Sequence, residues 1–125
     1  MAPEDEMTFL RRVSEALRTP VDQLNPGQLR LLISQQVELD RLVPLGIALI
    51  ADQPLLEGGF YPGDLFAAVC EVPIDYWLTH PAETAEVERL IRAVAPQLTE
   101  RATDEYLQAA IVTFRRATAD RAATG

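Results

Sequence analysis

The sequence contains no lysine, a single cysteine and a single histidine among its 125 residues. All 11 basic residues are therefore arginines, and the 19 acidic residues leave a net charge of −8. Because an acidic protein is repelled by phosphate backbones and anionic lipids, we expect it to bind neither nucleic acid nor membranes. A basic protein would instead be attracted to it, most strongly at low ionic strength.

A long hydrophobic run is also missing. The longest apolar stretch, residues 42–51, is interrupted by Pro44 and Gly46 and is too short to cross a bilayer. The first eight residues are acidic and lack the basic and apolar regions of a secretion signal. Since the lone Cys70 lies in an apolar run and cannot form an internal disulfide, we expect a buried thiol and a cytoplasmic location.

Few side chains are available for a metal site or a catalytic site. His80 and Glu83 would supply at most two of the four ligands that zinc requires. A nucleophilic pair of Cys70 and His80 would need an exposed thiol, whereas Cys70 is expected in the core. The glycine-rich loop at residues 58–63 matches neither of the common nucleotide-binding patterns. We therefore expect no catalytic residues, no metal, no cofactor and no small-molecule substrate, and a protein that is not an enzyme.

Prolines divide the chain into segments that are each about one helix long. Most segments show the three-and-four spacing of apolar residues that is typical of an amphipathic helix, and none alternates β-branched residues as a strand would. Residues 42–52 are apolar on almost every side, which predicts a helix packed at the centre. The sequence thus predicts a single all-α domain over residues 1–125, a compact bundle of six to seven short helices.

Local signals indicate where these helices begin and end. Thr8 is the expected cap of the first helix, and its face of Leu10, Val13 and Leu17 should join the core. Residues 25–28 have the arrangement of a capping box with proline at the first helical position. Further helices are expected at about 62–72, 73–79, 87–94 and 103–119, with a frayed tail at 120–125.

Acidic side chains gather around the glycine-rich loop and the helix that follows it. Asp64 and Glu71 are seven positions apart, so they would share one face of a helix over residues 62–72. Tyr61 is expected to be exposed because of its place in the loop. The candidate partner-binding residues are Glu57, Tyr61, Asp64, Glu71 and Asp75.

Several motifs in the central part of the chain follow one another at fixed separations. They are LRLLISQQ at 29–36, LVPL at 42–45, PLLEGGFYPGDL at 54–65, the pair Tyr76-Trp77 and the step His80-Pro81. As a set, over a core of about residues 28–92, they resemble a short helical family of immunity proteins from bacterial contact-dependent growth inhibition (CDI) systems. Ser34 stands where glycine is expected in that family, and Gly59 where aspartate is expected.

The resemblance implies a non-enzymatic protein that stays in the cytoplasm and binds the C-terminal toxin domain delivered by a neighbouring cell. Such toxins are often nucleases and therefore basic, which agrees with an acidic inhibitor. Residues 1–27 and 96–125 lie outside the motifs and are candidates for the specificity towards one toxin. The sequence favours a monomer and leaves the oligomeric state open.

Two other functions stay open from the residues alone. One is a general helical adaptor that binds another cytoplasmic protein or a second copy of itself. The other is a carboxylate-dependent hydrolase with a site near Glu57 and Asp64, which would require these two side chains to converge in a deep pocket.

Overall fold

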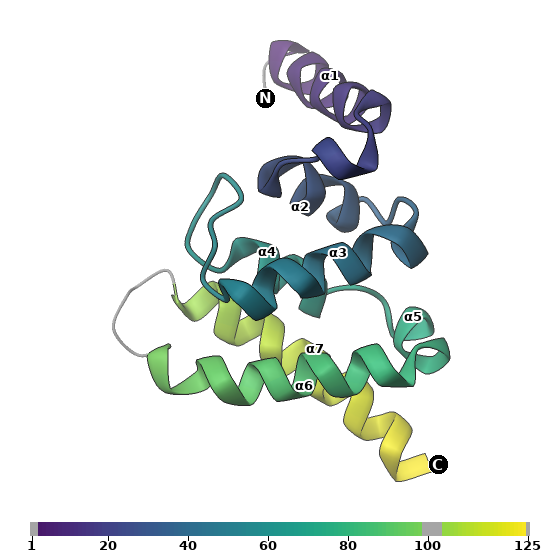
Figure 1. Ribbon diagram of the computed structural model, residues 1–125, viewed down its shortest axis with the longest axis vertical. Coiled ribbons are helices and arrows are strands. Elements are labelled where there is room, and N and C mark those ends of the chain that lie inside the picture. The colour runs from purple at the N-terminus through teal and green to yellow at the C-terminus, as the bar shows by residue number, and fades with distance from the viewer. Residues whose placement is uncertain (1–2, 99–103, 125) are drawn as a thin grey trace.

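The computed structural model describes residues 3–98 and 104–124, and its side chains from Met7 to Leu98 and from Asp104 to Ala119. Within these ranges the fold is all-α, as predicted, with seven α-helices and no β-strand (Figure 1). None of these helices is long and apolar enough to span a membrane. The elements are α1 (Pro3–Arg18), the 3-10 turn η1 (Val21–Gln23), α2 (Pro26–Ser34), α3 (Leu39–Asp52), α4 (Asp64–Cys70), α5 (Ile74–Thr79), α6 (Pro81–Val94), the 3-10 turn η2 (Ala95–Gln97) and α7 (Asp104–Thr124).

The central helix is α4. All seven of its residues are buried, and it packs against α2, α3 and α7. The helix predicted at residues 42–52 packs among others as expected, since α3 contacts α2, α4 and α6. It is not buried on every side, because Pro44 and Leu45 are exposed. Each of the two helices packs against three others, but the neighbours of α4 cover it completely, whereas those of α3 leave one side exposed.

Several helix limits follow from local signals, and others do not. The capping box before α2 is confirmed, since the Asn25 side chain accepts a hydrogen bond from the Gln28 amide at 2.8 Å and the Gln28 side chain accepts one from the Asn25 amide at 3.1 Å. The first helix begins at Pro3 rather than after Thr8. The helix expected at 62–72 is shorter at both ends, and α7 continues beyond residue 119 to Thr124. Residues 99–103 and 125, which include Thr103 and the end of the expected tail, lie outside the described residues.

The first helix lies at one end of the molecule and packs mainly on α2 (Figure 1). Only Ala16 of its described side chains is buried, and Val13 is half-buried. The expectation that Leu10 and Leu17 join the core is wrong, because 62% and 53% of their surfaces are exposed. A helix with one neighbour can bury only a narrow part of its circumference, so α1 keeps an exposed apolar face.

The last helix closes the core over α4 and α5. Trp77 of α5 is fully buried and packs edge-to-face on Phe114 of α7, with ring centroids 5.2 Å apart. Its indole N–H donates to the carbonyl of Val72 at 3.0 Å. Cys70 is buried as expected, and burial raises the pKa of its thiol.

Candidate functional site

The loop between α3 and α4, residues 53–63, is held in shape by the first side chain of α4. Asp64 is only 3% exposed, and its carboxylate accepts hydrogen bonds from the backbone amides of Gly58 and, at 2.9 Å, of Phe60. Gly63, at φ +90°, turns the chain from the loop into α4, a backbone conformation that favours glycine. The loop is therefore a fixed element of the surface.

Arg30 of α2 also binds this loop. Its Nε donates to the carbonyl of Gly58 at 3.1 Å and lies 3.8 Å from the Asp64 carboxylate. Burial lowers the pKa of Arg30, and the charge of Asp64 opposes this effect. A Cβ atom on Gly58 would come within 3.1 Å of both the Asp64 carboxylate and the Pro26 carbonyl. We call Arg30, Gly58 and Asp64 the loop latch.

The loop latch decides which aromatic ring of the loop faces solvent. Phe60 is 65% exposed, and the Arg30 guanidinium lies 4.2 Å from the centre of its ring. Tyr61, which the sequence predicts to be exposed, is half-buried, and its ring lies 5.1 Å from that of Tyr106 in α7. Burial raises the pKa of Tyr61, with smaller contributions from nearby acidic groups. The exposed ring was missed because the sequence does not show on which side of the loop each residue lies.

The structure distributes the five candidate residues differently from the expected single face. Asp64 is buried in the loop latch, whereas Glu71 is exposed beyond the last turn of α4, so these two do not form a shared exposed face. The two residues are seven positions apart, as a shared helix face requires, but α4 is enclosed on every side and has no exposed face. Glu57 and Asp75 are exposed, in the loop and at the start of α5.

Most of the negative charge lies in one part of the chain. Residues 38–88 contain ten acidic residues and one arginine, and we call them the acidic segment. Glu57, Glu71 and Asp75 form no ion pair with any described side chain, whereas Glu88 is paired with Arg92 and Arg115. The exposed members of the segment are Glu38, Asp40, Asp52, Glu57, Glu71 and Asp75.

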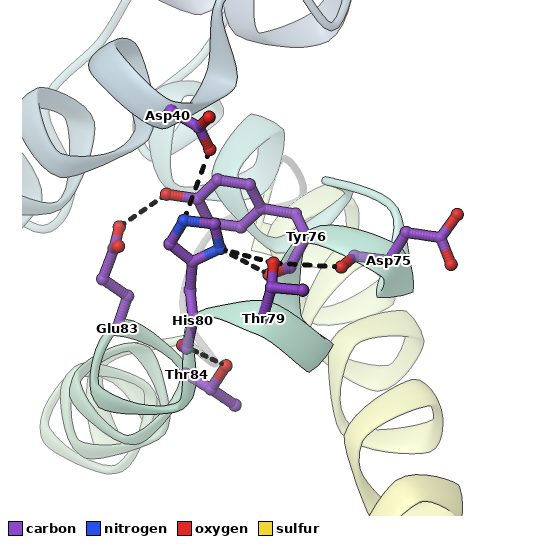
Figure 2. Close-up of polar contacts among 7 residues, drawn as sticks. All are labelled: Asp40, Asp75, Tyr76, Thr79, His80, Glu83 and Thr84. Atoms are coloured by element: carbon purple, nitrogen blue, oxygen red, sulfur yellow. Dashed lines mark hydrogen bonds and ion pairs between the residues drawn. The ribbon is translucent and has the colours of Figure 1, made fainter.

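A polar junction joins α3 to α5 and α6 (Figure 2). The His80 ring stacks on Tyr76 at 3.8 Å, with Nδ1 2.8 Å from the Tyr76 carbonyl and Nε2 3.3 Å from the Asp40 carboxylate. The Tyr76 hydroxyl donates to Glu83 at 2.7 Å, and burial, followed by this hydrogen bond, raises the pKa of Tyr76. Figure 2 shows the Asp75 carboxylate pointing away from these groups.

This junction has the composition of a catalytic relay but not its geometry. Thr79 Oγ1 lies 2.9 Å from His80 Nδ1, and Asp40 lies on the other side of the ring. However, Nδ1 also faces the Tyr76 carbonyl, and the Thr79 hydroxyl is within 3.0 Å of that same carbonyl. These hydrogen bonds end α5 and hold the imidazole in place, so the group serves as a connection between helices.

The geometry needed for a hydrolase at Glu57 and Asp64 is not present. Both oxygens of the Asp64 carboxylate accept hydrogen bonds from the loop, and Glu57 is exposed. Neither residue lines the cleft of about 610 Å³ that lies beside the loop, between α1 and α2. Across the described residues, no three His, Cys, Asp or Glu side chains are grouped as a metal site would require.

Comparison with known proteins gives a match to the family model of CDI immunity proteins over residues 1–87. No match was found among curated proteins or among solved structures. The matched region contains the loop latch and nearly all of the acidic segment, and it also includes residues 1–27, which the central motifs do not cover. Since the match spans well over half of the sequence, the chain belongs to the family of CDI immunity proteins.

Proposed function

We propose that this protein neutralises one CDI toxin by binding the toxin domain in a one-to-one complex, without chemistry of its own. Membership of the immunity family supports the toxin as the partner. We place the toxin contact on the acidic segment because of its charge, which comes from ten acidic residues and only one arginine. The bound face of the toxin is accordingly basic.

A basic nuclease in the cytoplasm is the toxin that fits this surface best. A nuclease must attract a phosphate backbone, so its substrate-binding face is positive. An acidic protein competes for the same face, because complementary potentials accelerate encounter and charge pairs at the contact slow dissociation. Binding there would exclude the nucleic acid and so stop the reaction.

Within the acidic segment, Glu57, Glu71 and Asp75 are our proposed contact residues. All three are exposed and form no ion pair with the described side chains, so their charges are available to a partner. Tyr61 would contribute its exposed edge. Asp64 is buried, and we assign it an indirect role, which is to hold the loop that carries Glu57.

Titration calorimetry with the cognate toxin domain tests this proposal. Glu57→Arg, Glu71→Arg and Asp75→Arg should each weaken binding about tenfold or more, a loss of roughly 1.4 kcal/mol per factor of ten. The matched control is Glu105→Arg, which makes the same charge change at an exposed position on α7, outside the acidic segment. It should change the affinity less than threefold.

Three results would count against the proposal. Absence of binding by the wild-type protein at low salt would overturn the toxin-binding function. If all four substitutions weakened binding equally, net charge alone would account for the loss of affinity. The acidic segment would then not be a defined contact surface. Full nuclease activity in a saturated complex would show that neutralisation does not occur by exclusion of nucleic acid.

A further inference from the structure

The cleft beside the loop differs in chemistry from the rest of the surface. Its volume is about 610 Å³, within the usual range for a binding pocket. One wall is α1 with Phe9 and Arg12, and the opposite wall is formed by Arg30 of α2 and by Phe60 of the loop. An acidic protein therefore presents two arginines and two phenylalanines in a single depression.

The charged side chains of this cleft are only partly paired with one another. Arg30 lies 3.8 Å from Asp64, so the loop latch compensates much of its charge. Arg12 is exposed, lies close enough to Arg30 to contribute to the lowering of its pKa, and forms no ion pair with any described side chain. Glu15 also lines the cleft without forming such a pair. Among the described side chains, Arg12 thus has no ion-pair partner, and it lines the same depression as Phe9 and Phe60.

We infer that this cleft receives a segment of the toxin domain that carries an apolar side chain next to a carboxylate. The apolar side chain would lie between Phe9 and Phe60, and the carboxylate would pair with Arg12. Arginine and aromatic residues are the types most often found at the energetic centre of protein interfaces. The inference rests on the proposed function, because it identifies a second contact with the same toxin.

The local structure favours a peptide over a nucleic acid as the occupant. A polyanion would have to pass the acidic segment, since Glu57 stands in the same loop as Phe60. One carboxylate needs only one cation, which Arg12 supplies. The loop latch already positions Phe60, since Asp64 binds its backbone amide and Arg30 lies over its ring, so little conformational freedom is lost when a partner covers it.

The first test compares two neighbouring arginines of α1. Arg12→Glu should weaken binding of the cognate toxin domain at least thirtyfold, because it places like charges opposite each other in the cleft. Arg11→Glu makes the same change of net charge on the same helix, but Arg11 is exposed and does not line the cleft. This control should change the affinity less than threefold. An acidic residue of the toxin whose replacement by arginine restores binding to Arg12→Glu would identify the pairing carboxylate.

The second test uses Gly59, which lines the cleft and has open space where a Cβ atom would lie. Its φ of +114° strains any side chain at this position, so the two variants are compared only with each other. Gly59→Asp adds a competing carboxylate beside the arginines, and Gly59→Asn has the same shape without the charge. The inference predicts that Gly59→Asp binds at least fivefold more weakly than Gly59→Asn. Attraction of a basic toxin by acidic charge alone predicts equal or tighter binding for Gly59→Asp.

The outcomes separate this inference from the proposed function. If Glu71→Arg weakens binding while Arg12→Glu behaves like Arg11→Glu, the cleft is not a contact and the proposed function stands. Gly59→Asp binding as tightly as Gly59→Asn would lead to the same conclusion. If the wild-type protein does not bind the toxin domain at low salt, both proposals fall.

Discussion

The backbone amide of Phe60 donates a hydrogen bond to the carboxylate of Asp64 at 2.9 Å, so an exposed aromatic ring is positioned by a buried acid. The same carboxylate accepts the amide of Gly58, whose carbonyl is bound by Arg30. Folding and the shape of the proposed binding surface are therefore coupled through a single side chain. Changes at Asp64 should affect both stability and recognition, although this residue is too deeply buried to meet a partner.

Replacement of Asp64 by asparagine should destabilise the protein by about 1–3 kcal/mol. Asparagine keeps one acceptor oxygen but turns an NH2 group towards a backbone amide, which leaves a buried donor unsatisfied. Glu71→Gln removes the same charge at an exposed position and should change stability by less than about 0.5 kcal/mol. Urea unfolding followed by circular dichroism measures both values. Equal stability of the two variants would show that the loop does not depend on this carboxylate.

The contact between Phe114 and Trp77 should dominate the attachment of α7, a helix beyond the region matched by the family model. Phe114→Ala opens a cavity against the fully buried indole and should cost about 3–5 kcal/mol. Val112→Ala is the control on the same helix, because Val112 is 48% exposed, and it should cost less than 1 kcal/mol. Thermal unfolding that follows the fluorescence of the only tryptophan measures the difference. A small effect of Phe114→Ala would mean that α7 is dispensable for the core.

The thiol of Cys70 should be unreactive in the folded protein. It is 1% exposed, and burial raises its pKa, so both access and thiolate formation are suppressed. A thiol reagent at pH 8 should leave the native protein unmodified over minutes and label one group per chain in denaturant. Rapid stoichiometric labelling of the native protein would contradict the burial of α4.

Ionisation of Tyr76 should make the protein less stable at alkaline pH. The folded-state pKa of Tyr76 is raised above the ordinary value of 10.0, so its contribution is complete below pH 10 and is lost as the pH rises above it. Tyr76→Phe should lower the free energy of unfolding by about 1 kcal/mol at pH 7, because the hydrogen bond to Glu83 is removed. As the pH rises above 10, the variant should lose less stability than the wild type.

The control for the Tyr76 measurement is Tyr106→Phe, at a ring that is 61% exposed. Its unfolding free energy should follow that of the wild type over the whole pH range. If the free energy of unfolding fell equally for Tyr76→Phe and the wild type at alkaline pH, ionisation of Tyr76 would not be the cause of the destabilisation.

The sequence alone determined the start of α2 and, to within one residue, the limits of α5. The cap at Asn25 acts on the amide of Gln28, three residues away. By contrast, α6 begins at Pro81 and not at residue 87 as predicted, although a proline at the first helical position loses no hydrogen bond. The ordered central motifs also identified the family, since their spacing is a property of the chain itself. These features depend on neighbours within about four residues, which is why they could be read before any packing was known.

Only the tertiary structure decided which of these residues are accessible. Residues far away in the sequence decide whether Phe60 or Tyr61 faces solvent. They also decide whether Asp64 contacts a partner or supports the loop, and whether α3 or α4 is the central helix. Arg30 is 28 positions from Gly58, and Phe114 lies 37 positions after Trp77, which it contacts. Burial depends on how many helices surround a side chain, and the periodicity of one helix carries no information about that number.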